Sequence, residues 1–244
     1  MKKKTTSFSI IQSKYRDSAR YKIVMKRIVS AIVTTSTASW CSLIAIGAYQ
    51  QTNDTNYFFQ YHPPFMAFGF LFFMTSGLLA PVNKLGRKIH STLQLMSVVC
   101  GTTGVTIAIV AKQKSGEPHL SSAHSIIGIL AVSGLIAQFI SGIVKYYRPS
   151  FVLRWHGLTG LATYLCGIGA LLTACVSYLC GNITTPDVKG SYMCKDADTD
   201  SIKYAISMFI PAITCIMLYV NKLSDPNHEL DSPDPRQYNR FGIA

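Results

Sequence analysis

Six apolar segments, separated by short polar stretches, dominate the pattern of hydrophobic and polar positions along this chain of 244 residues. Each segment is close to the roughly 20 residues that a helix needs to cross the hydrocarbon core of a bilayer. The segments lie at residues 28–49, 63–82, 89–111, 124–144, 156–179 and 203–222. The pattern therefore predicts an all-α membrane protein with six transmembrane helices.

Hydroxyl side chains and prolines modify this pattern but do not interrupt it. Serines and threonines dilute residues 28–49, and we retain this segment because their hydroxyls bond to carbonyls of the same helix. Pro63 and Pro64 suit the first turn of a helix, where the missing N–H is not needed. Pro211 falls inside the last segment and predicts a kink there.

The chain divides into two polar tails and one transmembrane domain. Residues 1–27 carry nine Lys or Arg and one Asp, and we expect a disordered cytosolic tail partly held to anionic lipid headgroups. They lack the short apolar core and cleavage site of a signal peptide. Residues 28–222 form the transmembrane domain, and residues 223–244 form a cytosolic C-terminal tail.

Charge is sparse and unevenly distributed, because only 14% of the residues are charged against about 25% in soluble proteins. Eighteen Lys and Arg fall in the tails and loops of one expected side, and five fall on the other. The positive-inside rule then places both termini in the cytosol. The basic residues lie between apolar segments and are not interleaved with aromatics, so the net charge of +12 indicates a membrane surface as partner and not nucleic acid.

Four histidines mark the ends of four successive apolar segments. His62, His90, His124 and His156 are separated by 28, 34 and 32 residues. Ionisable side chains inside a membrane are costly and are usually functional. Because successive helices alternate in direction, His62 and His124 fall near the non-cytosolic face and His90 and His156 near the cytosolic face. The sequence therefore predicts two histidine pairs at two depths.

Two histidines at each depth favour haem b over other metal centres. Helical bundles hold cofactors between facing helices, and two axial imidazoles leave no open position at the iron, which suits electron transfer. Zinc or copper needs three or four ligands at one depth, and no Cys-x-x-Cys-His motif for covalent c-type haem is present. Several glycines fall on the histidine faces, where they either admit a flat ring or serve ordinary helix packing: Gly69, Gly101, Gly128, Gly142, Gly160 and Gly167.

The cysteines divide into a buried group and a loop pair. Five lie inside apolar segments and are interpreted as small core residues. Cys180 and Cys194 flank the polar loop before the last segment, and they pair if that loop faces an oxidising compartment. The same loop contains the glycosylation sequon Asn182-Ile-Thr184. The sequence leaves open both the disulfide and the modification of Asn182.

The residues around the histidines resemble the cytochrome b561 family, and in particular its short six-helix branch. The similarity covers residues 61 to about 175. Its motifs are Tyr-His-Pro-Pro-Phe-Met at 61–66, Arg-Lys-Ile-His-Ser-Thr-Leu-Gln-Leu at 87–95, Pro-His-Leu-Ser-Ser-Ala-His-Ser at 118–125 and Arg-Trp-His-Gly-Leu-Thr-Gly at 154–160.

The resemblance implies a transmembrane ascorbate-dependent reductase with two haem b groups. Cytosolic ascorbate is the electron donor, and monodehydroascorbate or ferric iron on the lumenal or extracellular side is the acceptor. By register, His62 and His124 ligate the non-cytosolic haem and His90 and His156 the cytosolic one, as the topology also indicates. The resemblance is compatible with a homodimer, and we expect the endoplasmic reticulum or an endomembrane vesicle in preference to the plasma membrane.

Basic residues before two of the histidines are the candidates for binding the ascorbate anion. They are Lys84, Arg87, Lys88 and Arg154. The alternative is that they serve only as positive-inside anchors. On the far side, His119 with Lys112 and Lys114 either meets the acceptor or is an ordinary exposed loop.

The chain departs from the longer family members in two motifs that handle substrate there. Those members have a Tyr-Arg ending on the second helix and Ser-Leu-His-Ser-Trp at the fourth. This chain has Gly-Leu-Leu-Ala-Pro-Val-Asn at 77–83 and Ser-Ala-His-Ser-Ile at 122–126. The departures leave the donor and the acceptor open. Gln94, one turn after His90, is a further candidate for bonding a haem edge.

Three other functions fit parts of this pattern. The protein is a di-haem ferric reductase fed by a partner flavoprotein if ascorbate is not the donor. It is a transporter or channel if the histidines conduct protons or metal ions without haem. It is a membrane scaffold if the four histidines are dispensable. The sequence also leaves open which membrane the protein occupies and its oligomeric state.

Overall fold

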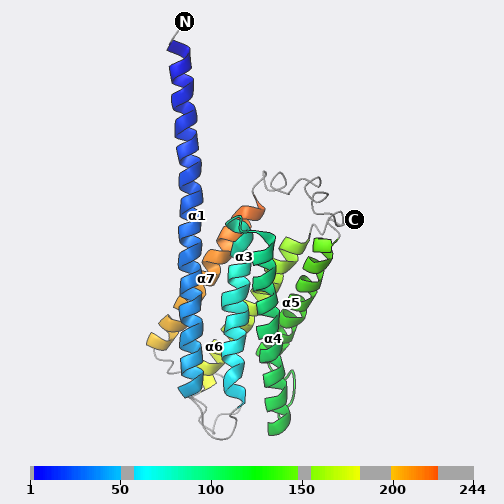
Figure 1. Ribbon diagram of the computed structural model, residues 1–244. Coiled ribbons are helices and arrows are strands. Elements are labelled where there is room, and N and C mark those ends of the chain that lie inside the picture. Colours follow the sequence, from blue (N-terminus) through cyan, green and yellow to red (C-terminus); the bar gives the residue numbers. More distant parts are fainter. Residues whose placement is uncertain (1–2, 51–57, 148–154, 182–198, 225–244) are drawn as a thin grey trace.

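The computed structural model describes residues 3–50, 58–147, 155–181 and 199–224, and the regular structure within these ranges is helical (Figure 1). The elements are α1 (Lys3–Gln50), η1 (Phe59–Tyr61), α2 (His62–Met66), η2 (Ala67–Met74), α3 (Thr75–Val82), α4 (Arg87–Ser115), α5 (Ala123–Tyr147), α6 (His156–Gly181) and α7 (Thr199–Leu223).

Six helical segments of the described chain are long and apolar enough to cross a membrane, which confirms the predicted fold class. They are Arg20–Tyr49, Phe59–Val82, Arg87–Ser115, Ala123–Tyr147, His156–Cys175 and Ile206–Leu223. Large apolar side chains such as Ile32, Leu130 and Ile210 are exposed on their outer faces. Such surfaces suit contact with lipid, and the protein is a multi-pass membrane protein.

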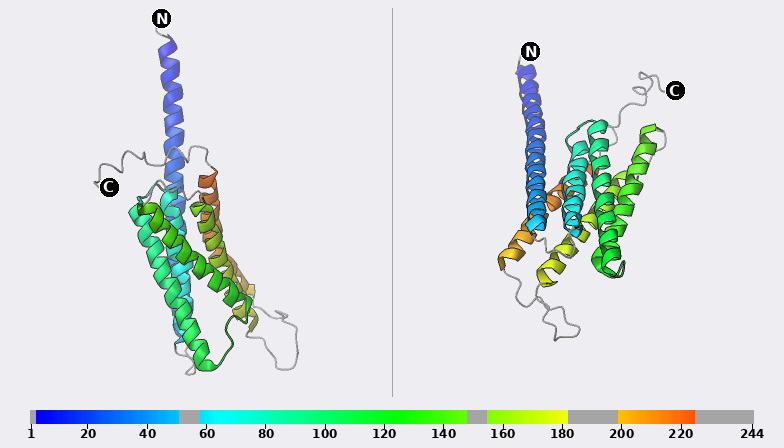
Figure 2. Two further views of the ribbon diagram at one scale, coloured as in Figure 1. Left: turned by 90° about the vertical axis from the view of Figure 1, so that its right-hand side faces the viewer. Right: turned by 60° about the horizontal axis from the view of Figure 1, so that its bottom comes forward.

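Helix α1 is longer than the sequence indicated. It begins at Lys3 and not near residue 28, so the structure draws most of the expected basic tail as helix. No Gly or Pro occurs between residues 2 and 46, and a helix has no intrinsic reason to stop there. Figures 1 and 2 show α1 extending well beyond the neighbouring helices. The contact of residues 1–27 with anionic lipid headgroups stays a prediction.

Most of the hydroxyls within α1 bond to carbonyls of the same helix as expected, whereas the buried Ser30 Oγ has no partner among the described residues. Thr34 Oγ1 donates to the carbonyl oxygen of Ser30 at 2.9 Å, and Ser39 Oγ donates to that of Thr35 at 3.0 Å. These bonds satisfy the polar side chains within their own helix, so the segment retains an apolar exterior. The serines and threonines are therefore compatible with a membrane span.

The second span is the centre of the bundle. Elements η1, α2, η2 and α3 follow one another without a break. In the most apolar stretch of this span 67% of the residues are buried, against 22–33% in the corresponding stretches of the other five spans. Phe70, Leu71 and Met74 are almost fully buried between α1, α4 and α6. Segment η2 is π-helical, so a helical phase counted at 3.6 residues per turn does not hold across it.

Three of the six glycines singled out in the sequence serve helix packing. A Cβ at Gly69 would lie 3.2 Å from the backbone nitrogen of Gly101, and a Cβ at Gly167 would overlap the ring of Phe70. Gly101 itself faces Leu135. These close approaches match the small-residue packing of membrane helices. At these three positions the contacts favour the second of the two alternatives, ordinary helix packing.

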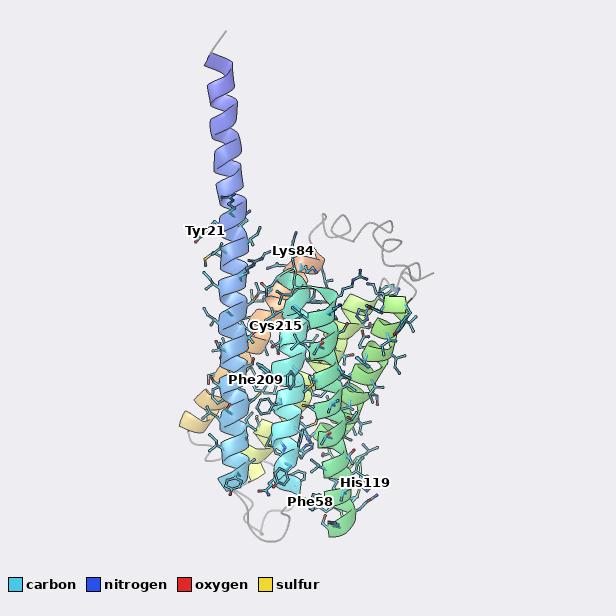
Figure 3. The ribbon with its side chains drawn as sticks, in the orientation of Figure 1. Tyr21, Phe58, Lys84, His119, Phe209 and Cys215 are labelled. Atoms are coloured by element: carbon cyan, nitrogen blue, oxygen red, sulfur yellow. The ribbon has the colours of Figure 1, made fainter. Side chains whose placement is uncertain are left out.

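The turn between α3 and α4 and the turn between α4 and α5 lie at opposite ends of the bundle. Figure 3 shows Lys84 at one end and Phe58 and His119 at the other. We call these the Lys84 end and the His119 end. The N-terminal part of α1 projects past the Lys84 end, and α7 ends there (Figure 1). The alternation of helix direction is as predicted.

Candidate functional site

The structure brings the four histidines together in two pairs. His62 of α2 faces His124 of α5, with ring centres 6.1 Å apart and planes at 87°. His90 of α4 faces His156 of α6, with ring centres 6.5 Å apart and planes at 82°. We call these the outer pair and the inner pair, after the membrane sides expected for them. The pairing is the one predicted from topology.

The separation within each pair suits two imidazoles on opposite sides of one iron. A metal–imidazole bond is about 2 Å long, and the ligating nitrogen lies roughly 1 Å from the ring centre, so trans ligands have ring centres about 6 Å apart. The separations of 6.1 and 6.5 Å agree with this value. Each pair therefore fits a bis-histidine haem.

Backbone carbonyls hold three of these imidazoles in the tautomer that such ligation needs. Nδ1 of His62 donates to Gly104 O at 2.8 Å, Nδ1 of His90 to Gly77 O at 2.8 Å, and Nδ1 of His124 to Ala170 O at 2.9 Å. A carbonyl oxygen accepts only, so the proton is on Nδ1 and the lone pair on Nε2 is available. Metal-bound histidines are commonly oriented in this way.

The fourth imidazole, that of His156, is held by a side chain. Its Nδ1 lies 2.9 Å from Ser141 Oγ on α5. The Ser141 hydroxyl donates its own hydrogen to the carbonyl oxygen of Gln138 at 2.8 Å. It therefore accepts from Nδ1 of His156, and the Nε2 lone pair of this ring is available as well.

An aromatic ring covers one member of the outer pair. The ring of Phe59 stacks on His62 with centres 5.2 Å apart and planes at 20°, and His62 is 8% exposed. Beside it, Lys114 Nζ lies 4.7 Å above the centre of the Phe58 ring. The outer pair is thus packed against apolar surface toward the His119 end.

The inner pair has more polar surroundings. Gln138 Nε2 donates to Thr159 Oγ1 at 2.6 Å, whereas Gln138 Oε1 is buried and has no hydrogen-bond partner among the described residues. That oxygen lies 3.6 Å from the position of a Cβ at Gly160, and a Cβ at Gly142 would lie 3.7 Å from Cε1 of His156. Small residues and one amide therefore line the inner pair.

Most of the basic residues predicted to bind the donor lie at the Lys84 end. Lys84, Arg87 and Lys88 are exposed in and beside the turn between α3 and α4. Arg154 lies outside the described residues. Gln94, the candidate for a haem edge, lies against Gly77, the residue whose carbonyl oxygen holds His90.

Two further lysines near the inner pair were not singled out from the sequence. Lys145 and Lys222 lie close enough to His90 for their charges to act on it, and Lys145 also acts on His156. They occupy the last turns of α5 and α7. In the sequence they counted only toward membrane orientation, because the proximity of these helix ends becomes visible only in the folded chain.

At the His119 end, two of the three residues predicted to meet the electron acceptor interact with other residues of the protein. Lys112 Nζ donates to the carbonyl oxygen of Pro118 at 3.1 Å, and Lys114 lies over Phe58. His119 is exposed at the tip of the turn between α4 and α5 (Figure 3). The side chains of Cys180, Cys194 and Asn182 lie outside the described part of the chain.

Comparison with known proteins gives the same family as the sequence motifs. Residues 61–184, half of the chain, match the family described as eukaryotic cytochrome b561. A mouse transmembrane reductase, CYB561D2, is 33% identical over 132 residues, which cover 47% of this chain and 59% of that protein. Transmembrane ascorbate ferrireductase 1 of Arabidopsis thaliana is 29% identical over 134 residues, which cover 50% of this chain and 56% of that protein.

A third relative has a similar extent of match. Probable ascorbate-specific transmembrane electron transporter 2 of Oryza sativa subsp. japonica is 28% identical over 141 residues, which cover 52% of this chain and 59% of that protein. The chain thus spans somewhat more than half the length of these curated relatives. The four histidines all fall within the matched family region.

Proposed function

Because the chain belongs to the eukaryotic cytochrome b561 family, we propose that it is a transmembrane electron-transfer reductase with one haem b held in each histidine pair. The observation that carries the proposal is the geometry of the pairs. Both have a ring separation that would suit two imidazoles holding one iron, and each Nδ1 atom has a hydrogen-bond acceptor. The family relationship supports haem as the group that this geometry receives.

The chain's own residues hold and orient the ligand set. His62 and His124 would hold the haem at the outer site, and His90 and His156 would hold it at the inner site. With two histidines engaged at each site, a bound haem would supply one-electron transfer and not oxygen chemistry. The hydrogen bonds at Nδ1 fix the orientation of each ring.

We propose ascorbate as the electron donor at the Lys84 end, which the positive-inside rule places in the cytosol. Two of the relatives carry ascorbate in their names. Ascorbate is an anion at neutral pH, and the positive charges of Lys145 and Lys222 act on His90. The exposed lysines and arginine at this end attract an anion before it reaches the inner pair. Arg154 belongs to the same proposal, because it precedes His156 by two residues.

We propose monodehydroascorbate or ferric iron as the acceptor at the His119 end, because one relative is named a ferrireductase. His119 is the exposed candidate there for contact with the acceptor. With this orientation, residues 28–222 are the transmembrane domain, the polar tails on either side are cytosolic, and an endomembrane is the expected location.

Purification in detergent tests the proposal directly. Absorbance is recorded for the oxidised protein, then with ascorbate and finally with dithionite, together with a haem-per-chain assay. Two b-type haems, largely reduced by ascorbate, are the expected result. Two haems that only dithionite reduces would exclude ascorbate and favour a partner flavoprotein as donor. A protein without haem would overturn the proposal and leave a histidine-lined transporter.

A further inference from the structure

The two histidine pairs differ in one hydrogen-bond acceptor, and the difference involves a side chain. We propose that Ser141 is a positioning residue that fixes the ring and the tautomer of His156, and that it thereby sets the haem affinity and the redox potential of the inner site. This inference rests on the function proposed above. It concerns the inner site, because both acceptors at the outer pair are backbone carbonyls.

Ser141 is placed for this role by its position on α5. It lies three residues after Gln138, so its hydroxyl reaches back to the Gln138 carbonyl oxygen at 2.8 Å while facing His156 of α6 at 2.9 Å. Helices α5 and α6 pack closely along their lengths. The hydroxyl therefore joins the backbone of one helix to the histidine of the next.

The bond to Gln138 decides the direction of the bond to His156. A serine hydroxyl has one hydrogen and can either donate or accept. If it donated to Nδ1, the proton of His156 would be on Nε2 and the ring could not ligate iron. Because the hydrogen is donated to the Gln138 carbonyl oxygen, Nδ1 of His156 must donate and Nε2 is available. At the other three histidines, a carbonyl imposes this tautomer without assistance.

The same bond tunes the ligand. An acceptor at Nδ1–H makes an imidazole more basic and a stronger donor to its metal. A more strongly donating imidazole favours ferric over ferrous iron, so the potential falls as the bond strengthens. Removing the Ser141 hydroxyl leaves the half-buried Nδ1–H of His156 without its acceptor, which costs free energy. We therefore expect weaker haem binding and a higher potential at the inner site.

The outer pair offers a comparison with the opposite sign. Thr173 Oγ1 donates to Ala170 O at 2.9 Å, and the same oxygen accepts from Nδ1 of His124 at 2.9 Å. The threonine competes with the histidine for one carbonyl. Thr173→Val removes the competitor, so the bond of His124 strengthens and the potential of the outer haem falls slightly.

The experiment compares Ser141→Thr with Ser141→Val in the full-length protein. The two replacements have nearly the same size and shape and differ in the hydroxyl. Haem per chain, haem dissociation and both midpoint potentials are measured by mediated spectroelectrochemistry, without ascorbate. We expect the threonine variant to resemble the wild type. We expect the valine variant to bind the inner haem about 10- to 100-fold more weakly, with a raised potential at that haem and an unchanged outer haem.

The inner haem is identified by repeating both replacements in a His124→Ala background, which removes one of the two histidines of the outer pair. Equal behaviour of the threonine and valine variants would show that the hydroxyl is irrelevant and would overturn the inference. Loss of both haems from the valine variant alone would also overturn it, because the hydroxyl would then support the whole bundle. A wild-type protein with two haems that ascorbate does not reduce would contradict only the proposed donor, and a wild type without haem would contradict the proposed function itself.

Discussion

The outer and inner histidine pairs have almost the same ring separation but different supports. The outer pair is fixed by two backbone carbonyls and covered by Phe59. The inner pair is fixed by one carbonyl and by Ser141, and two lysines lie near it. The comparison indicates that helix crossings set the spacing that a metal ligand pair needs. Side chains then make the two sites chemically different.

The supports also differ in what substitution can change. A backbone carbonyl survives every substitution at its own position, so Gly104 and Ala170 hold their histidines whatever side chain they carry, provided the helices still approach. The bond to Ser141 disappears with one hydroxyl. The outer site is therefore sensitive to helix packing, and the inner site is sensitive to individual polar side chains.

The largest expected effect comes from removing one ligand. His90→Ala should reduce the haem content from two per chain to one, because the inner pair loses an axial nitrogen and the outer pair does not change. Haem per chain after purification measures this. The matched control, His119→Ala, removes an exposed histidine at the opposite end and should retain both haems. Two haems in the His90→Ala protein would show that the pairing is wrong.

The second-largest expected effect concerns the outer site, which depends on helix packing. A Cβ at Gly104 would lie 2.7 Å from Met66 Sδ and 3.3 Å from Phe65 Cβ. Gly104→Val should push α4 away from α2, lengthen the bond from His62 and weaken the outer haem about 10- to 100-fold, at a cost in stability of about 1–3 kcal/mol.

The measurement is the dissociation of each haem together with thermal unfolding. Gly47→Ala is the control, because no atom of a neighbouring described element lies within 4 Å of the added Cβ. Preferential loss of the inner haem in the Gly104→Val protein would contradict the assignment of Gly104 to the outer site.

The third effect concerns the charges near the inner pair. Lys145→Gln combined with Lys222→Gln should slow haem reduction by ascorbate several-fold at low ionic strength, because an anionic donor loses electrostatic attraction. The difference should shrink as salt screens the charges. Stopped-flow reduction against ionic strength measures it, with Lys22→Gln and Lys26→Gln on α1 as a control of equal charge. Equal slowing in the control would mean that only the net charge matters.

The parts of this arrangement that the sequence predicted are those with a local signal. Apolar length identified the spans, and the histidines at their ends required only alternating helix directions to form pairs. Ser141 has no such signal, because a serine in an apolar helix is common and its partner His156 lies on another helix. The proximity of Lys222 to His90 depends on how α7 packs, which no local pattern encodes.

Helix rotation accounts for the glycines that pack against neighbouring helices. Gly69 lies within the π-helical segment η2, where the angle per residue differs from that of an α-helix. The space beside Gly167 is filled by the ring of Phe70, which belongs to the same segment η2. The rotation of this central helix follows from packing against several neighbours, so helical phase counted from His62 for Gly69, or from His156 for Gly167, did not reveal these contacts.

The smallest effect tests the aromatic cover of the outer pair. Phe59→Leu removes a ring that stacks on His62 at 5.2 Å, and such pairs contribute about 0.5–1.5 kcal/mol beyond their buried area. The outer haem should therefore dissociate only a few-fold faster, with the inner haem unchanged. Phe58→Leu is the matched control, because its ring contacts Lys114 and no stacking on His62 is lost. If both replacements act equally on the outer haem, apolar cover at the His119 end matters and stacking does not. If only Phe59→Leu acts, the stacked ring is part of what distinguishes the outer pair from the inner pair.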